Sequence, residues 1–376
     1  MRMQLLGRLS ARTFLSQFWQ KRPLLVRQAI PGFGGAVQAS ELLALAARDD
    51  VESRLVSRRR GAWHLRHGPF ARSETDRLPK KDWTILVQGV NQVLPAADAL
   101  LRRFRFIPYA RLDDVMASYA APGGGVGPHV DSYDVFLLQG PGRRRWSVAG
   151  PRPWKLDPSA PLKILRGFRP EESWLLEPGD LLYLPPGWGH EGVALEPSFT
   201  YSIGFRAPSD REVAGEFLAF LQDRIHFDGL YADPGMKLQR HPAEIPARML
   251  RHAAVVARKV RWRERDLGLF LGEYLSTPKP QVVFTRPRRR LSPEEFAKRS
   301  GSHGLRLDLN TRMLFRNRDF FINGERVESS GRTQGWLARL ADERSLPPPM
   351  PMPKGILPLL HSWFRSGWIR IGDRHE

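Results

Sequence analysis

The chain has 376 residues, too many for one ordinary small domain, and 41% of them are hydrophobic, which is enough to bury a core. It has no cysteine, which excludes disulfides and thiolate metal sites, so any bound metal must be held by histidine and carboxylate side chains. Its 59 basic residues against 39 acidic ones give a net charge of +20, which favours association with polyanions such as RNA-rich particles.

The sequence carries neither a membrane signal nor a nucleic-acid-binding signature. The start of the chain lacks an uninterrupted apolar run behind basic residues, and no later run approaches the length of a membrane span. Nothing in it is similar to a zinc finger or an RNA-recognition motif. We therefore expect a cytoplasmic protein with no membrane contact and no sequence-specific nucleic-acid binding.

The N-terminal part predicts short elements that flank a larger unit. Apolar side chains recur at helical spacing over residues 10–19, and Pro23 ends this expected helix. Residues 24–27 follow as a short strand, and a second helix is expected from residue 40, with Ser40 as its N-cap.

Alternating polar and apolar residues then predict two antiparallel strands at 51–59 and 62–67. A further strand within 82–91 and a helix over 96–104 are expected to lie outside the barrel that follows.

Short strands separated by glycine and proline turns predominate from residue 113 to 205, without a long helical pattern. This pattern is typical of an all-β barrel. In the strand that begins at Asp114, alternation puts Asp114, Met116 and Ser118 on one face. We expect that face to line the same cavity as His129.

His129 and Asp131 are two residues apart, so on an extended strand both side chains point to one face and can share a metal ion. His190, after a predicted strand and a Pro-Pro-Gly turn, offers a third ligand. Two histidines and one carboxylate with open coordination positions are the facial triad of non-haem Fe(II) oxygenases. Zinc hydrolysis uses the same ligand types and remains possible from these three residues alone.

Residues 212–223 and 243–260 are amphipathic helical stretches that can form a small bundle against the barrel. From Gln281 the pattern predicts a strand, a helix with a capping box that begins at Ser292, another strand, a hairpin over 313–327 and a helix over 333–342. This order resembles a winged helix.

The turn of that hairpin is expected at Asn323-Gly324. The proline-rich segment 347–353 reads as a stiff linker to a short terminal tail.

The order of these motifs resembles that of JmjC-type oxygenases, which have a double-stranded β-helix (cupin) barrel, and in particular the bacterial ribosomal oxygenases. The resemblance rests on the glycine-rich lead-in to the first histidine, the apolar run 135–138, the basic strand 143–146 and the block 177–190. It extends from residues 14–25 to 201–208, and more weakly to the C-terminus.

The resemblance implies a mainly β fold with helices, divided into three units. These are a JmjC/cupin catalytic domain with an N-terminal α/β flank at 1–208, whose barrel core spans about 105–206, a helical dimerisation region at 209–275, and a winged-helix-like domain with a C-terminal tail at 276–376. A homodimer is implied as well.

The implied reaction depends on Fe(II), with 2-oxoglutarate as co-substrate and O2, and its catalytic metal ligands are His129, Asp131 and His190. Many JmjC enzymes place a lysine on the next inward strand to bind the distal carboxylate of 2-oxoglutarate. Here Arg144 occupies that register and can bind the carboxylate as a bidentate fork. Ser118 is expected to add a hydroxyl bond.

The implied substrate is the β-carbon of an arginine side chain in a large-subunit ribosomal protein of the L16 type. A guanidinium stays protonated, so it needs an anion and flat surfaces along its stem. We expect Asp114 to supply the charge, Tyr133 and Met116 to contact the stem, and Ser202 to make a weaker contact.

Several alternatives remain open. Asp114 has an alternative role in a structural salt bridge with Arg111 or Arg105. The alternative reactions are histidyl hydroxylation or lysine demethylation of another basic protein. A catalytically silent cupin that acts in ribosome assembly is the alternative from another class, although such a protein has no need of a complete ligand set.

Overall fold

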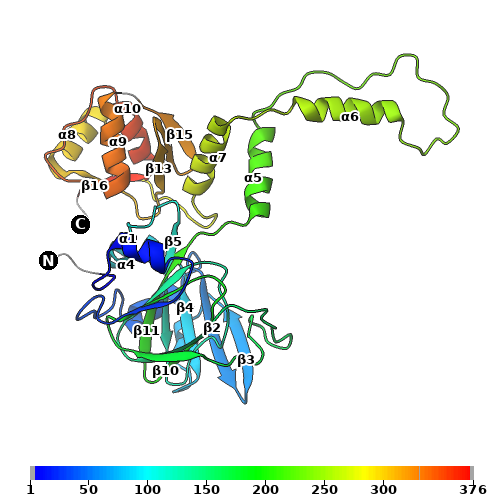
Figure 1. Ribbon diagram of the computed structural model, residues 1–376. Helices are drawn as coiled ribbons and strands as arrows, with labels where there is room; N and C mark the ends of the chain where they lie inside the picture. The colour runs from blue at the N-terminus through cyan, green and yellow to red at the C-terminus, as the bar shows by residue number, and fades with distance from the viewer. Residues whose placement is uncertain (1–4, 330, 373–376) are drawn as a thin grey trace.

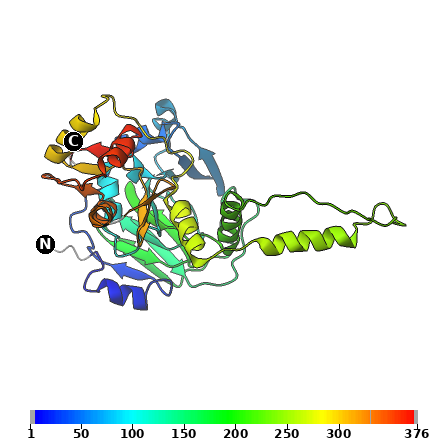
Figure 2. The ribbon, with the colours of Figure 1, turned by 90° about the horizontal axis from the view of Figure 1, so that it is seen from above.

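In the computed structural model, which describes residues 5–329 and 331–372, a large β-rich body carries a smaller α/β body above it, and a helical arm projects to one side (Figure 1). The view from above shows the same arm extending away from both bodies (Figure 2). Within the described residues, no helix combines the length and the apolar character needed to cross a lipid bilayer.

Two antiparallel sheets form the large body. The larger sheet has the strand order β1-β9-β6-β11-β5-β4-β2-β3, and the smaller has the order β10-β7-β8. The strands of the larger sheet are Leu24–Val26 (β1), Ser53–Arg59 (β2), Ala62–His67 (β3), Trp83–Val87 (β4), Leu112–Ala120 (β5), Val135–Gln139 (β6), Leu181–Leu184 (β9) and Ser198–Phe205 (β11). Those of the smaller sheet are Arg144–Ala149 (β7), Glu172–Leu176 (β8) and Gly189–Ala194 (β10).

The two sheets face each other over a small apolar cluster. It is built from Val135, Leu137, Trp146, Val148, Leu176, Leu182 and Leu184. These residues alternate with others that point away, as the period of a strand requires. The predicted double-stranded β-helix is thus confirmed.

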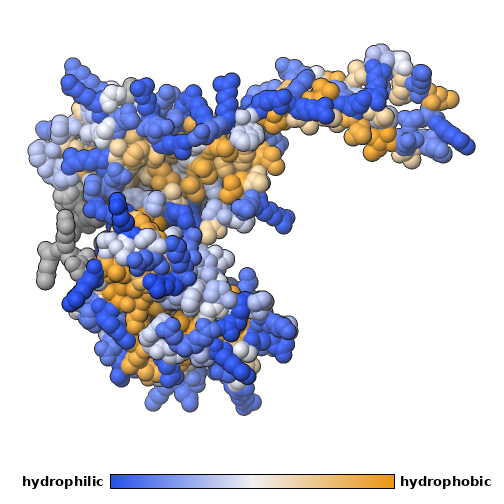
Figure 3. All heavy atoms as spheres, viewed as in Figure 1, coloured by the Kyte–Doolittle hydropathy of each residue, from blue (hydrophilic) through white to orange (hydrophobic). Residues whose placement is uncertain are grey.

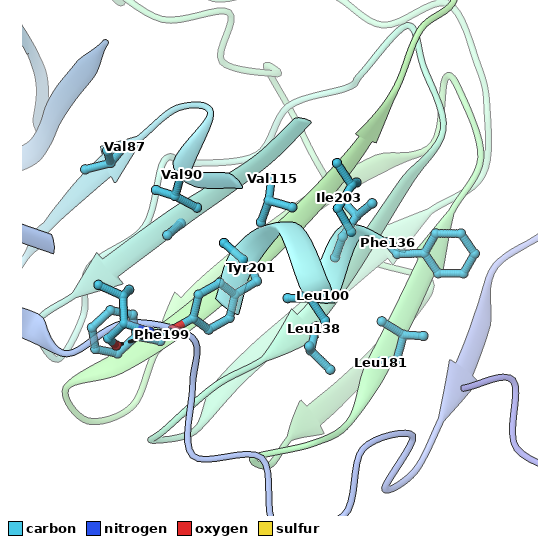
Figure 4. Packing of buried hydrophobic residues seen from close by; sticks show 14 of the residues in the cluster. Val87, Val90, Leu100, Val115, Phe136, Leu138, Leu181, Phe199, Tyr201 and Ile203 are labelled. Carbon is cyan, nitrogen blue, oxygen red and sulfur yellow. Dashed lines mark hydrogen bonds between the residues drawn. The ribbon is translucent and has the colours of Figure 1, made fainter. Parts of the chain in front are cut away.

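The outer face of the larger sheet carries the main core, and short helices cover it. Figure 4 shows Val115, Tyr201 and Ile203 on the strands, with Leu100 from the covering helix beside them. The helical elements of this body are Ala11–Gln17 (α1), Ala39–Ala46 (α2), Arg72–Thr75 (α3), Val90–Gln92 (η1) and Pro95–Arg102 (α4). Because the apolar residues of β5 and β11 point to the helices, their alternate residues are left to face the second sheet.

The helical region consists of Asp210–Gln222 (α5), Ala247–Lys259 (α6) and Glu264–Ser276 (α7). The helix α7 packs against the smaller body, whereas α6 and its flanking loops form the projecting arm (Figure 1). Phe217 and Phe220 of α5 pack against Phe270 of α7 in a small cluster of their own. In contrast, α6 has no buried residue. Figure 3 shows apolar atoms exposed along this part of the arm.

The smaller body has its own core and two three-stranded sheets, β16-β12-β17 and β13-β14-β15. Its helices are Pro293–His303 (α8), Arg332–Glu343 (α9) and Leu357–Arg365 (α10). Its strands are Leu305–Leu307 (β12), Met313–Arg316 (β13), Asp319–Ile322 (β14), Glu325–Glu328 (β15), Ser345–Leu346 (β16) and Ile369–Ile371 (β17). The expected capping box at Ser292 and Glu295 is present.

Several local expectations were wrong. The second helix has Gln38 at its N-cap, not Ser40. The strand expected from Gln281 does not form. The strand β4, placed outside the barrel by the sequence, pairs with β2 and β5 inside the larger sheet, because its buried residues fit a central position.

The C-terminal expectations also need correction. The hairpin over 313–327 is a three-stranded meander, in which Asn323 and Gly324 make only the second turn. Both residues have positive φ, which is why this pair suits a two-residue turn. The segment after 353 is no free tail, since α10 packs into the core and β17 pairs with β12. Its last residues, 373–376, lie outside the described residues.

Candidate active site

The two sheets of the large body enclose a cavity of about 530 Å3. Its lining includes all nine residues that the sequence analysis singled out: Asp114, Met116, Ser118, His129, Asp131, Tyr133, Arg144, His190 and Ser202. They come from both sheets and from the loop between β5 and β6. The structure thus brings together residues that span 89 positions of the chain, from Asp114 to Ser202, counting both ends.

His129 and His190 are held opposite each other by the backbone. They form an isolated antiparallel bridge in which each amide donates to the other residue's carbonyl oxygen at 2.9 Å. The two imidazole centroids are 4.2 Å apart. His129 therefore does not lie on a continuous strand, as the sequence had suggested. A single bridge to β10 sets its position.

Asp131 completes a three-residue cluster with these histidines. Its carboxylate oxygen lies 3.6 Å from Nε2 of His190, and its backbone carbonyl accepts from the amide of Gly187 at 2.9 Å. One ligand atom from each of the three side chains lies within 4.8 Å of the other two. Ligands of one ion at about 2.1 Å from it must lie within roughly 4.2 Å of one another, so only a small inward movement is needed.

Backbone carbonyls orient both imidazole rings. Nδ1 of His129 lies 2.9 Å from the carbonyl oxygen of Gly127, and Nδ1 of His190 lies 2.9 Å from that of Trp188. Only a protonated Nδ1 can donate to a carbonyl, which leaves Nε2 with its lone pair for a metal. Burial, and after it the charge of His129, lowers the pKa of His190 to about 4, against the opposing effect of Asp131. His190 is thus neutral at physiological pH, the form that binds a metal.

Arg144 forms the far end of the cavity. It is only 3% exposed, while its neighbours Arg143 and Arg145 point to solvent. Its guanidinium donates to Oγ of Ser118 at 3.2 Å and to the carbonyl oxygen and Oγ of Ser198, both at 3.3 Å. Burial lowers its pKa to about 10, so it remains a cation. No carboxylate among the described residues pairs with it, and a buried unpaired charge is costly unless a ligand neutralises it.

Three buried donors around this cation lack a partner within the part of the chain that the structure describes. They are Nε of Arg144, Nε1 of Trp146 and Oγ1 of Thr84. All three residues line the cavity. Because buried polar groups are normally paired, this set indicates a site for an anionic ligand that accepts several hydrogen bonds. A molecule with a carboxylate at one end and metal-binding oxygens at the other fits both the cation and the triad.

Asp114 lies at another part of the same cavity and is 3% exposed. Both of its carboxylate oxygens accept from Nε2 of Gln88, at 2.8 and 2.9 Å, and one accepts from Nζ of Lys279 at 2.6 Å. The salt bridge considered with Arg111 or Arg105 is wrong, because those side chains pair with other carboxylates in the structure. The partner is a lysine from beyond the arm.

The remaining expected residues border the space between the triad and Asp114. Tyr133 is 39% exposed, and desolvation of its hydroxyl, reinforced by Asp131 and Asp114, raises its pKa, so the phenol stays neutral. Met116 and Ser202 are half-buried on neighbouring strands and line the cavity.

Four lining or contacting residues were missed from the sequence: Thr84, Gln88, Trp146 and Lys279. Thr84 lies on the cavity face of β4, and alternation would have pointed to it had that strand been placed in the sheet. Trp146 shares the face of Arg144 by the same rule. Lys279 had no sequence signal, since it is separated from Asp114 by 165 positions.

The comparisons with known proteins agree with this geometry. A family model described as a JmjC domain matches residues 99–213, and one described as a ROXA-like winged helix matches residues 259–353. The ribosomal protein uL16 3-hydroxylase of Escherichia coli (strain K12) is 38% identical to this chain over 325 residues, which are 85% of this chain and 86% of that protein.

Solved structures of the Escherichia coli protein ycfD are similar along the whole chain. One X-ray structure has a TM-score of 0.85 at 34% identity and covers 97% of this chain and 98% of its own. Another, of the ribosomal oxygenase YcfD in complex with cobalt and 2-oxoglutarate, has a TM-score of 0.81 at 33% identity, with coverage of 98% and 99%.

We expect the purified chain to bind one divalent metal ion, and Asp131→Ala to weaken that binding by at least about 100-fold, since losing even an outer-shell contact costs about 10–100-fold. Calorimetric titration with Co2+ measures the affinity. His67→Ala, which removes an exposed histidine, is the matched control. Equal affinity of the Asp131 variant and the control would place the ion elsewhere.

Proposed function

The chain belongs to the bacterial JmjC ribosomal oxygenases, and from this membership we propose that it hydroxylates the β-carbon of an arginine side chain in the large-subunit ribosomal protein uL16, with Fe(II), 2-oxoglutarate and O2. The observation that carries the proposal is one cavity that holds the triad of His129, Asp131 and His190 between a buried cation, Arg144, and a buried anion, Asp114. The proposed substrate is that of the Escherichia coli relative, a ribosomal protein uL16 3-hydroxylase.

His129, Asp131 and His190 would hold the iron, and their three side chains leave one side of it open. With iron and 2-oxoglutarate bound, O2 would be the oxidant: one of its oxygen atoms would enter the C–H bond, and the other would oxidise 2-oxoglutarate to succinate and carbon dioxide. The protein contributes the positions of both substrates and a cavity with largely apolar walls that keeps bulk water away. Among those walls are Val56, Leu65, Leu86, Val135 and Leu137.

Arg144 would bind the distal carboxylate of 2-oxoglutarate. Ser118 and Ser198 hold its guanidinium from one side, so the fork is presented in a fixed orientation. The unpaired donors of Trp146, on the smaller sheet, and of Thr84, on the larger sheet, face the same cavity and are available to the bound anion.

Asp114 would pair with the guanidinium of the substrate, and Tyr133 would pack along its stem. A cation needs such a carboxylate, whereas a neutral imidazole does not, so Asp114 favours arginine over a histidine acceptor. Met116 and Ser202 border the same path and would contact the side chain on its way to the metal.

We also propose the division into a catalytic unit at 1–208, a helical unit at 209–275 and a winged-helix-like unit at 276–376. Separate apolar cores within 5–205 and within 291–369 support the two outer units. Because the proposed substrate is a ribosomal protein, we propose that the enzyme acts in the cytoplasm.

The helical unit would join two copies of the chain. In α6, Leu250 is 68% exposed and Val255 is 52% exposed, and a helix of this length is marginal without a packing partner. Its position on a projecting arm (Figures 1 and 3) leaves this apolar surface accessible to a second copy.

The reaction is tested by incubating ribosomal proteins with the purified chain, Fe(II), 2-oxoglutarate and O2, followed by peptide mass spectrometry. We expect a gain of one oxygen on a single arginine of uL16, absent with His129→Ala. Modification of a histidine, or loss of a methyl group from lysine, would replace the arginine assignment. If neither 2-oxoglutarate turnover nor modification occurs, a silent cupin is the better description.

Arg144→Lys is expected to raise the KM for 2-oxoglutarate by about tenfold, because a lysine cannot form the two parallel hydrogen bonds of a guanidinium fork. Succinate formation measured against 2-oxoglutarate concentration gives the value. Arg143→Lys, at the exposed position immediately before this strand, should leave the KM unchanged. An unaltered KM in the Arg144 variant would assign the carboxylate to another residue.

The dimer is tested by light scattering on the full chain. We expect a particle of twice the chain's mass, and a shift toward single copies in Leu250→Glu, because a charge on the apolar side of α6 is costly to bury. Arg251→Gln, at the next position of the helix, controls for a change in surface charge. A single-copy mass for the unaltered protein at micromolar concentration contradicts the proposal.

A further inference from the structure

The side chain of Lys279 binds the carboxylate of Asp114, to which the substrate's guanidinium is proposed to bind. Its Nζ lies 2.6 Å from one oxygen of Asp114 and 3.2 Å from one oxygen of Asp113. Lys279 stands between Pro278 and Pro280, in the segment that follows α7. Because proline restricts its own backbone and that of the residue before it, this segment presents the lysine from a stiff support.

The carboxylate of Asp114 has little remaining capacity. Gln88 bonds both oxygens, and Lys279 bonds Oδ2. An incoming guanidinium makes a bidentate contact only if both oxygens are accessible. With Lys279 in place, the substrate can reach at most the remaining lone pair of Oδ1.

The surrounding charges make a shared arrangement costly. Asp113 also forms ion pairs with Arg206 at 3.6 Å and Arg312 at 3.4 Å. With Lys279, three cations therefore already share the two carboxylates of Asp113 and Asp114. Burial, followed by the charge of Arg206, lowers the pKa of Arg312 to about 10, as expected in a region crowded with positive charge. A substrate guanidinium would add a fourth cation to this partly buried cluster.

The side chain of Lys279 has an adjacent space into which it can rotate. It also lines a neighbouring, solvent-open hollow of about 750 Å3, whose other lining residues include Asp113, Glu212, Glu216 and Glu273. The side chain of Lys279 is 23% exposed, whereas that of Asp114 is 4% exposed. Rotation of the lysine stem into the hollow would keep the ammonium among carboxylates while releasing Asp114.

We propose that Lys279 is an internal placeholder for the substrate's guanidinium: it neutralises Asp114 in the substrate-free protein and yields that carboxylate when arginine binds. The inference rests on the proposed function and deepens it, since it names a residue that sets the affinity for the cationic substrate. Displacing the lysine lowers the net affinity for the arginine side chain, in the way that any competing native-state contact does.

Lys279→Met keeps the length and removes the charge. We expect the KM for a uL16 peptide that contains the target arginine to fall by about tenfold, with kcat unchanged, because the peptide no longer competes with the lysine. Lys279→Arg keeps a cation on Asp114 and should not lower the KM. A KM that rises or stays the same in Lys279→Met overturns the placeholder and makes the lysine a structural support of Asp114.

A second measurement uses the unaltered protein and is independent of how the variants fold. The extent of chemical acetylation of each lysine is measured by mass spectrometry under anaerobic conditions, with and without a saturating amount of the peptide. Labelling of Lys279 should increase with the arginine peptide and not with its Arg→Ala counterpart, while labelling of the exposed Lys354 stays constant. Unchanged labelling of Lys279 contradicts the proposal.

These experiments distinguish failure of the proposed function from failure of the proposed role of Lys279. If the unaltered enzyme does not hydroxylate the arginine peptide, the proposed function fails, and the placeholder fails with it. If hydroxylation occurs but either the KM of Lys279→Met or the labelling of Lys279 does not change as expected, the function stands and only the placeholder is lost.

Discussion

The pair of backbone hydrogen bonds between His129 and His190 is the constraint on which the site depends. Outside this bridge, the loop that carries His129 and Asp131 belongs to no strand, yet its first ligand must face the edge of the smaller sheet. The bridge fixes that distance through the main chain and leaves the side chains to converge. The carbonyl groups of Gly127 and Trp188 then orient both rings, so neither histidine needs a carboxylate bonded to its Nδ1.

Around this bridge, the cavity separates two charges of opposite sign that the protein itself does not pair. Arg144 is buried among hydroxyl and carbonyl groups at one end, and Asp114 lies at another part of the wall, where it forms an ion pair with Lys279. The arrangement suits two ligands of opposite charge: a dicarboxylate, which would bring the missing partner of Arg144, and a guanidinium, which would replace Lys279 on Asp114. It also explains why a chain of net charge +20 can accept a basic substrate, since the local charge near Asp114 changes when Lys279 moves.

The acidic pair Asp113 and Asp114 also links the site to the rest of the molecule. Asp113 forms ion pairs with Arg312 and Lys279, both from the winged-helix-like unit, while Asp114 lines the cavity. A movement of Lys279 would therefore alter contacts between the two bodies as well as the substrate site.

The sequence by itself determined the barrel strands, the helical stretches that follow them and the local chemistry, because strand alternation and ligand spacing are short-range properties. It did not predict that α6 projects as an arm, since we expected these helices to form a bundle against the barrel. It placed Asp114, Met116 and Ser118 on one face and separated Arg144 from Arg143 and Arg145. Only the tertiary structure decided which distant residues meet them. The position of β4 inside the sheet brought Thr84 and Gln88 to the cavity, and the packing of the C-terminal body brought Lys279 to Asp114. Such pairings follow from the burial of whole elements against one another, and a periodic pattern within any single segment does not encode them.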